Sequence, residues 1–159
     1  MIFLVVGCDA TGKTTLCNKL KEKYNLTIIH KDKPKNEEEQ EYMFKEYKSL
    51  FLSSNNFIMD RSFYCEMVYG PIFRNKSSID VVQQRALEDI LDFKGAAIIY
   101  CWDYAKNIFE RFKETKESFV ITLEQINKIQ LGYQQILETV DTIPVIYLNN
   151  FERSDSLVV

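Results

Sequence analysis

Five short segments rich in Ile, Val, Leu, Phe and Tyr recur along the chain, and stretches with helical periodicity separate them. The segments cover residues 2–6, 26–30, 57–59, 96–101 and 144–148. Four of them are almost continuously apolar, which is typical of strands covered on both faces. Strands that alternate with helices form βαβ units with parallel strands. The pattern therefore predicts an α/β fold of three layers, in which helices flank a five-stranded parallel sheet.

The clearest helical signals lie in the second half of the chain. Apolar residues at steps of three and four predict a helix over residues 122–140, with a Thr-x-x-Gln capping box at its start. A second helix is predicted over residues 79–93, with Ser77 or Ser78 as its N-terminal cap. In the first half, the three glutamates at residues 37–39 predict the acidic first turn of another helix.

A phosphate-binding motif follows the first predicted strand directly. The residues Gly7-Cys8-Asp9-Ala10-Thr11-Gly12-Lys13-Thr14 match the Walker A pattern G-x-x-x-x-G-K-[ST]. Glycines let such a loop curl so that backbone N–H groups point at phosphate oxygens, and the following helix adds its positive N-terminal end. Lys13 is predicted to bridge the β- and γ-phosphates, and the Thr14 hydroxyl to bind Mg²⁺. The alternative, a chance match in a glycine-bearing turn, is disfavoured because a strand precedes the motif and a helix follows it.

The motif therefore predicts binding of a nucleoside triphosphate with Mg²⁺. The predicted phosphate-binding residues are Gly7, Asp9, Ala10, Thr11, Gly12, Lys13, Thr14 and Thr15. The motif does not identify the acceptor, because switches, motors, hydrolases and kinases share it.

Asp60 and Arg61 come directly after the third predicted strand. In an open parallel sheet ligands gather at the carboxyl ends of the strands, so both side chains are expected beside the phosphate loop. Asp60 is predicted to hold the hydrated Mg²⁺, and Arg61 to grip an acceptor phosphate or hydroxyl through its planar guanidinium. The alternative is an exposed Asp-Arg pair that merely ends the strand.

Several motifs then follow one another in a characteristic order. They are Gly7-x-Asp9-x-x-Gly12-Lys13-Thr14-Thr15, Asp60-Arg61-Ser62, Tyr69-Gly70-Pro71, Ile108-Phe109-Glu110-Arg111, and the stretch from Ile121 to Tyr133. Together they resemble the thymidylate kinase and deoxynucleoside kinase branch of the P-loop kinases. The resemblance implies one P-loop kinase domain over residues 1–159 with a short lid at about residues 111–121. It also implies ATP and Mg²⁺ as cofactors, small-molecule nucleotide substrates, and a homodimer.

The resemblance also implies roles for single residues. It places Asp9 in contact with the substrate or with an acceptor-site arginine, and Arg61 at the acceptor phosphate or 5′ oxygen. It makes Arg111 the lid cation that stabilises the transferring phosphoryl group, with Lys113 and Lys116 either assisting or forming a solvated face. The predicted catalytic residues are therefore Lys13, Asp60, Arg61 and Arg111.

Further residues are candidates for substrate binding. Arg74 is expected at the substrate site or, equally, as an ordinary surface arginine. Four aromatic residues offer flat faces on which a base can stack, and one or two of them are expected to do so. They are Phe44, Phe63, Tyr64 and Tyr69, of which Tyr69 is also a predicted substrate contact. A purine pocket is expected near Asn149 and Asn150, after the fifth strand.

Asp32 decides between two kinds of acceptor. A nucleoside hydroxyl needs a carboxylate base, whereas a monophosphate is already ionised and mainly needs cations. Asp32 follows the second strand, where such a base belongs, but Lys31 and Lys33 flank it. We therefore predict a thymidylate kinase-like enzyme that converts a deoxynucleoside monophosphate to the diphosphate. The alternatives are a deoxynucleoside kinase that phosphorylates the 5′-hydroxyl, a kinase acting on nucleic acid, or a nucleotide-dependent switch.

Composition narrows these possibilities. The 159 residues predict a single domain, and 20 Lys and Arg against 23 Asp and Glu give a net charge of −3. That balance disfavours a dedicated nucleic-acid binder. No apolar run is long enough to span a bilayer and the first residues lack a basic leader, so a cytoplasmic location is expected. The four cysteines form no metal-binding pattern and are expected to be reduced thiols, mostly buried.

Overall fold

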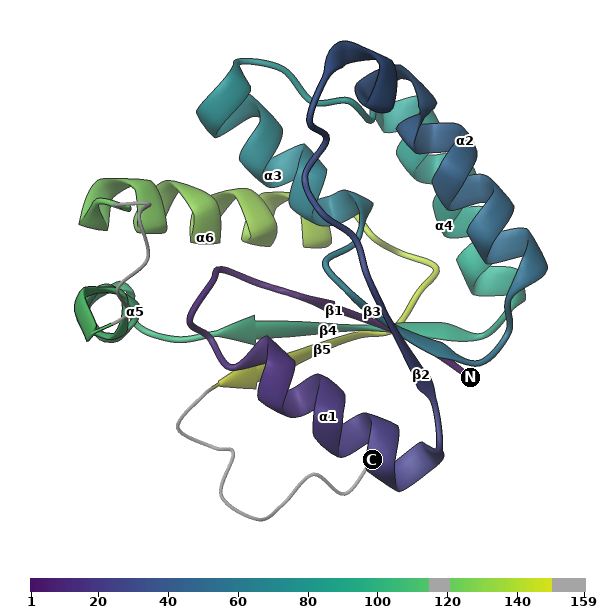
Figure 1. Cartoon of the computed structure of the whole chain (residues 1–159), viewed down its shortest axis with the longest axis horizontal. Coiled ribbons are helices and arrows are strands. Elements are labelled where there is room, and N and C mark those ends of the chain that lie inside the picture. Colours follow the sequence, from purple (N-terminus) through teal and green to yellow (C-terminus); the bar gives the residue numbers. More distant parts are fainter. Residues whose placement is uncertain (115–120, 150–159) are drawn as a thin grey trace.

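A computed structural model of the chain describes residues 1–114 and 121–149. A single parallel sheet runs through it in the order β2-β3-β1-β4-β5 (Figure 1). The strands are β1 (Ile2–Val6), β2 (Thr27–His30), β3 (Phe57–Asp60), β4 (Ala96–Trp102) and β5 (Val145–Asn149). The predicted five strands are all confirmed, with bounds that differ by one residue at most at either end.

Helices cover both faces of the sheet and make the three predicted layers (Figure 1). They are α1 (Lys13–Tyr24), α2 (Glu37–Ser53), α3 (Phe63–Arg74), α4 (Val81–Phe93), α5 (Ala105–Glu114) and α6 (Leu123–Leu137). α1 packs on one face, while α2, α3, α4 and α6 pack on the other. α5 lies beyond the carboxyl end of β4.

The central strand β1 shows why the sheet needs both layers. Ile2, Leu4 and Val6 belong to the core beneath α2, α3, α4 and α6, whereas Phe3 and Val5 belong to the core beneath α1. Successive side chains of a strand point to opposite faces, so an unbroken apolar strand is stable only between two covering layers. The strands β2 and β5 at the sheet edges are less buried, and every residue of β2 is partly or fully exposed.

The structure contains the helix starts that the sequence predicts, with one exception. Thr122 and Gln125 form the predicted capping box, and the three glutamates occupy the first turn of α2. The prediction that Ser77 or Ser78 caps α4 is wrong. Asp80 caps it instead, in a second capping box with Gln83. The reason is that the Ser77 hydroxyl is used in a turn with Ile79.

The strand register brings distant residues to one edge of the sheet. Val5 of β1 lies beside Asp60 of β3, and Val6 lies beside Tyr100 of β4. The segments that leave β1, β3 and β4 therefore start next to one another. His30, the last residue of β2, lies beside Asp60 on the other side. None of the described helices combines the length and the apolar content that crossing a bilayer requires.

Candidate active site

The loop between β1 and α1 curls tightly against the end of β4. Gly7 has φ +141° and Gly12 has φ +80°, a region that side chains rarely adopt. A Cβ atom at Gly7 would lie only 2.1 Å from the carbonyl oxygen of Cys101. Ala10 also has a positive φ, at +59°. These conformations give the loop the curl that the Walker pattern predicts.

Helix α1 begins directly at the end of this loop. Gly12 occupies the cap position and has no side chain with which to bind the first N–H groups. The first turn carries no acidic residue, and the side chains of Thr14 and Thr15 are exposed. Free N–H groups at a helix N-terminus form a site for an anion. The beginning of α1 therefore has the geometry to receive a phosphate group.

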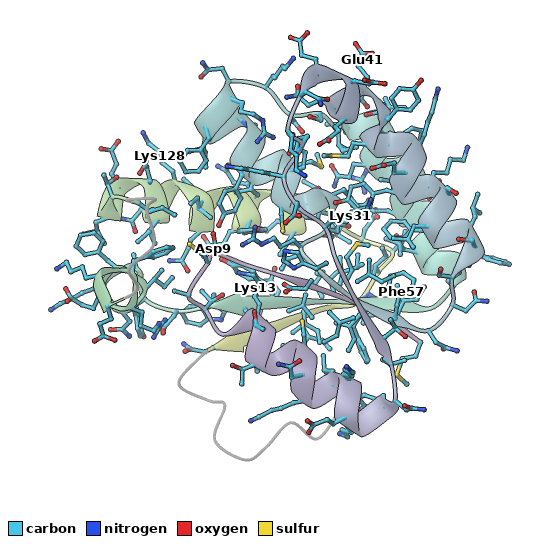
Figure 2. All side chains as sticks on the ribbon, viewed as in Figure 1. Asp9, Lys13, Lys31, Glu41, Phe57 and Lys128 are labelled. Carbon is cyan, nitrogen blue, oxygen red and sulfur yellow. The ribbon has the colours of Figure 1, made fainter. Side chains whose placement is uncertain are left out.

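Lys13 points back into the loop. Its Nζ atom donates a hydrogen bond of 2.7 Å to the Cys8 carbonyl oxygen and lies 3.6 Å from Oδ1 of Asp9. Figure 2 shows Asp9 and Lys13 close together at the carboxyl end of β1. The Thr11 hydroxyl donates a second hydrogen bond, of 2.6 Å, to the same carbonyl. With 6% of its surface exposed, Lys13 is held inside the loop by these contacts.

Asp9 connects the phosphate loop with the end of β3. Nη2 of Arg61 donates a hydrogen bond of 3.2 Å to Oδ1 of Asp9, so one carboxylate faces two cations, Lys13 and Arg61. Burial lowers the pKa of Arg61, but Asp9 and, to a lesser extent, Cys65, Tyr69 and Asp60 together outweigh this effect and raise that pKa above its usual value. The Tyr69 hydroxyl accepts a hydrogen bond of 3.3 Å from the Asp9 N–H. The structure thus brings Asp9 and Arg61 together, and it adds Tyr69, whose contact with Asp9 was not predicted.

The backbone of Arg61 is itself unusual, with φ +67°. A non-glycine residue in this region costs of order 1–3 kcal/mol and persists only where its surroundings fix it. Here the end of β3 fixes it on one side and the cap of α3 on the other, where the Ser62 hydroxyl accepts a hydrogen bond from the Tyr64 N–H. The strain turns the Arg61 side chain toward the phosphate loop.

A histidine lies between the two aspartates predicted for this edge. Nδ1 of His30 is 3.1 Å from Oδ2 of Asp60, and Nε2 is 3.5 Å from Oδ1 of Asp32. Asp60 is buried, with 7% of its surface exposed, whereas the Asp32 side chain is 76% exposed. No role for His30 was predicted from the sequence. Its position at the end of β2, as the single histidine of the chain, was the available signal.

A cleft of about 220 Å³ opens beside Asp32, between the loop that follows β2 and the N-terminal half of α2. Its lining combines charged loop residues with two buried apolar side chains of α2. The lining residues are Lys31, Asp32, Lys33, Pro34, Lys35, Glu39, Met43, Glu46 and Tyr47. Lys31 forms an ion pair of 3.3 Å with Glu46, and its N–H donates to the Asp60 carbonyl. The cleft therefore adjoins the ends of β2 and β3.

Arg111 reaches the phosphate loop from α5. Its Nε donates a hydrogen bond of 2.7 Å to the Ala10 carbonyl, and its Nη2 donates one of 2.6 Å to Oδ2 of Asp103. Burial raises the pKa of Asp103, but hydrogen bonds from Arg111, Asn107 and the Tyr104 N–H together hold that pKa below its usual value. Asp103 was not predicted as a site residue, although its place directly after β4 was a usable signal.

Lys113 and Lys116 differ from Arg111. Lys113 pairs with Glu110 at 3.0 Å and lies 4.5 Å from the centre of the Phe109 ring, so it belongs to a solvated face of α5. Lys116 and Asn150 lie outside the described residues, as does most of the expected lid. Of the described residues, the structure therefore places Arg111, which was predicted as the lid cation, at the phosphate loop.

Arg74 is turned toward its own helix. It forms an ion pair with the buried carboxylate of Glu66, which also accepts a hydrogen bond of 2.9 Å from the Ser78 N–H. Within the described part of the chain, no hydrogen bond or ion pair joins Arg74 to the phosphate loop. Glu66 was not predicted as a site residue, because a buried carboxylate on a helix has no distinct sequence signal.

The aromatic candidates divide in two groups. Phe63 and Tyr64 are completely buried, and Tyr64 donates a hydrogen bond of 2.8 Å to Glu88 of α4. They belong to the core and offer no face to a ligand. Phe44 and Tyr69 are only partly buried. The expectation that one or two of the four can stack on a base is thus restricted to these two.

The cysteines are free thiols, and Cys8, Cys17 and Cys101 are buried, as predicted. Burial raises the pKa of Cys8 to about 11 and that of Cys17 to about 12. Because the thiolate is the reactive form, neither side chain is a nucleophile at neutral pH. Cys8 contributes to the loop through its backbone carbonyl, which accepts the hydrogen bonds from Thr11 and Lys13.

Comparisons with known proteins support the fold. No family model matches the chain, and no curated protein matches its sequence. Among solved structures, the YorR protein from Bacillus subtilis in complex with phosphorylated GDP has a TM-score of 0.83 at 22% identity, covering 97% of this chain and 88% of YorR. Deoxyadenosine kinase from M. mycoides with bound dCTP has a TM-score of 0.60 at 17% identity, covering 95% and 91% of the two chains. The same kinase with bound dATP has a TM-score of 0.60 at 16% identity. The chain therefore has the P-loop fold that these nucleotide-bound proteins share.

Proposed function

We propose that the protein transfers the γ-phosphate of ATP to a deoxynucleoside monophosphate and forms the diphosphate. The observation that carries the proposal is the Asp9–Arg61 contact, which joins the donor loop to the arginine that we assign to the acceptor. A switch that only binds nucleotide has no need of an arginine at that place. The similarity in fold to a kinase and to a protein bound to phosphorylated GDP supports the same class of reaction.

On the donor side, the N–H groups at the start of α1 bind the phosphates of ATP. Lys13 exchanges its contact with the Cys8 carbonyl for the β- and γ-phosphates and follows the charge during transfer. The exposed Thr14 hydroxyl and the Asp60 carboxylate are oxygen donors that fit Mg²⁺, which takes its other ligands from phosphate and water. When bound, Mg²⁺ supplies charge stabilisation for the phosphoryl oxygens.

On the acceptor side, Arg61 and the lysines of the cleft meet the anionic substrate. Arg61 is aimed toward the phosphate loop by its strained backbone and by Asp9. A monophosphate presents an ionised oxygen, so it requires positive charge and alignment more than a base. Lys31, Lys33 and Lys35 line the adjoining cleft and add positive charge there, next to an equal number of carboxylates, those of Asp32, Glu39 and Glu46.

A second candidate is phosphorylation of the 5′-hydroxyl of a deoxynucleoside. The observation in its favour is Asp32, a carboxylate that lines the cleft and contacts His30. The solved deoxyadenosine kinases share the fold and add support. We rank it second because Asp32 is open to water and shares the cleft with three lysines, surroundings that favour a solvated carboxylate over a base.

The test compares acceptors directly. ATP turnover with Mg²⁺ is measured with deoxynucleosides, with their monophosphates and with oligonucleotides under the same conditions. We expect product with at least one monophosphate and a lower kcat/KM for every free nucleoside. Turnover with oligonucleotides alone, or ATP hydrolysis that no acceptor accelerates, would contradict the proposal.

Replacing Arg61 with alanine is expected to raise the KM for the acceptor far more than the KM for ATP, since the proposal assigns the guanidinium to the acceptor phosphate. If the contact tightens during transfer, kcat falls as well. Initial rates over both substrate concentrations separate the two constants. An equal increase in both KM values would place Arg61 on the donor side.

Replacing Asp32 with asparagine is expected to leave activity on a monophosphate largely intact. Loss of a required general base costs about 10²- to 10⁴-fold in rate, so the two candidate functions differ by far more than assay error. The matched control is Asp141→Asn, because the Asp141 side chain is 78% exposed and lies outside the site. A collapse of activity in the Asp32 variant alone, together with a wild-type preference for the nucleoside, would favour the second candidate.

A further inference from the structure

The guanidinium of Arg111 is fixed at two points that lie far apart in the sequence. One is the Ala10 carbonyl of the phosphate loop, 101 residues away, and the other is the Asp103 carboxylate at the end of β4. A long side chain loses conformational entropy when it is held in this way, so such a double contact requires compensating bonds. The short charge-assisted bond to Asp103 supplies one of them.

Asp103 is built into the fold more firmly than an exposed ion-pair partner. Its side chain is 1% exposed, and Oδ1 accepts hydrogen bonds from the Tyr104 N–H at 2.7 Å and from Asn107 at 3.0 Å. These bonds satisfy one oxygen and direct the other, Oδ2, to Arg111. A buried carboxylate is costly without such partners. Its position relative to β4 is therefore set before any ligand binds.

The contact with Ala10 acts on the phosphate loop itself. In a trans peptide the C=O and the following N–H point in opposite directions. Arg111 holds the Ala10 carbonyl toward α5, so the N–H of Thr11 points away from α5. The positive φ of Ala10 gives this peptide a conformation that the loop alone does not favour. Arg111 thus stabilises one orientation of a loop amide.

We propose that Asp103 is a positioning residue, which holds Arg111 against the phosphate loop and thereby fixes both the lid cation and the Thr11 amide before the nucleotide arrives. Among the described residues, two of the five N–H groups of the guanidinium are used in the two bonds, which leaves three for phosphate oxygens. The inference rests on the proposed function for its effect on rate. It adds that Asp103, at the end of β4, already positions the lid cation Arg111, so this position does not depend on the lid alone.

The alternative is that the Asp103–Arg111 pair only stabilises the fold. Four variants separate the two roles: Asp103→Asn, Arg111→Ala, the double variant, and Glu110→Gln as control. Asparagine keeps the shape of Asp103 and its acceptor for Tyr104 but loses the charge that binds Arg111. Glu110 neighbours Arg111 on α5 and pairs only with exposed Lys113 among the described residues.

We expect Asp103→Asn to lower kcat by about 10- to 100-fold, the effect of displacing a catalytic group by about 1 Å. The KM for ATP is expected to change by less than about threefold, and Glu110→Gln to leave both constants unchanged. In the double variant, Asp103→Asn is expected to slow Arg111→Ala no further, because it acts through Arg111. Multiplied losses in the double variant would overturn the proposal.

Two more measurements keep the outcome decisive. If Asp103→Asn does not fold, Arg111→Lys replaces it. Lysine keeps the charge but has a single nitrogen in place of the Nε and Nη2 atoms that separately reach Ala10 and Asp103, so kcat is expected to fall similarly, and full activity would overturn the proposal. If the wild type phosphorylates no acceptor, the proposed function fails and the positioning role is read from the Thr11 amide resonance of the nucleotide-free protein. That resonance is expected to shift in Arg111→Lys and not in Glu110→Gln, and an unchanged resonance would overturn the inference.

Discussion

Phosphoryl transfer is expected to fall by roughly 10²- to 10³-fold when Lys13 is replaced with alanine, while the protein keeps its fold. A preorganised charge aimed at a developing negative charge contributes about 3–4 kcal/mol to transition-state stabilisation. The fold survives because the Cys8 carbonyl, which Lys13 binds, still accepts the hydrogen bond from the Thr11 hydroxyl. Initial rates at saturating ATP and acceptor give the effect on kcat.

The control for this variant is Lys19→Ala. Lys19 is an exposed lysine on the same helix, α1, and changing it removes the same charge and side-chain length away from the loop. Its rate is expected to match the wild type. Wild-type turnover in Lys13→Ala, or equal losses in both variants, would show that the loop does not hold the transferred phosphate.

Replacing Gly7 with alanine is expected to lower the free energy of unfolding by about 3–5 kcal/mol, through steric overlap and backbone strain together. The new Cβ would lie 2.1 Å from the Cys101 carbonyl oxygen, which is part of β4 and cannot move without disturbing the sheet. The φ of +141° adds strain to any L side chain. Urea unfolding measures the change in stability, and activity is expected to be lost with the loop geometry.

Gly95→Ala separates the two contributions. Gly95 also has a positive φ, +64°, but a Cβ placed there meets no atom within 4 Å. Only the backbone cost of about 1–2 kcal/mol is expected. If both variants lose the same stability, the close approach of the loop to β4 is not what requires glycine at position 7.

Local patterns determined the elements of this protein. Continuous apolar runs give five strands because a strand buried on both faces has no place for a polar side chain. The capping box at Thr122 and the sequence motif of the phosphate loop each depend on residues within about eight positions of one another. Interactions of such short range can be predicted from the chain alone. The sequence could not show that β2 is an edge strand, because apolar residues such as Ile28 and Ile29 occur in edge strands and in central strands alike.

The partners of the charged residues depended on the tertiary structure. The conflict of an aspartate inside an anion-binding loop was visible in the sequence, but its contact with Arg61 needs the register of β1 and β3. The ion pair that engages Arg74 was not predicted from the sequence, because its partner Glu66 lies two helical turns away on α3. His30 received no role because its neighbours Asp60 and Asp32 meet it only when β2 and β3 pair.

The sequence by itself determined the five strands, the phosphate loop and the places of Asp32, Asp60 and Arg61 at the carboxyl ends of the strands. The tertiary structure alone decided that Arg111 crosses to Ala10, that Asp103 holds it there, and that Phe63 and Tyr64 belong to the core. The physical reason is the separation along the chain over which each kind of interaction acts. Hydrophobic periodicity and capping act between near neighbours, whereas the pairing of a buried charge depends on which residues of other elements come within hydrogen-bond distance.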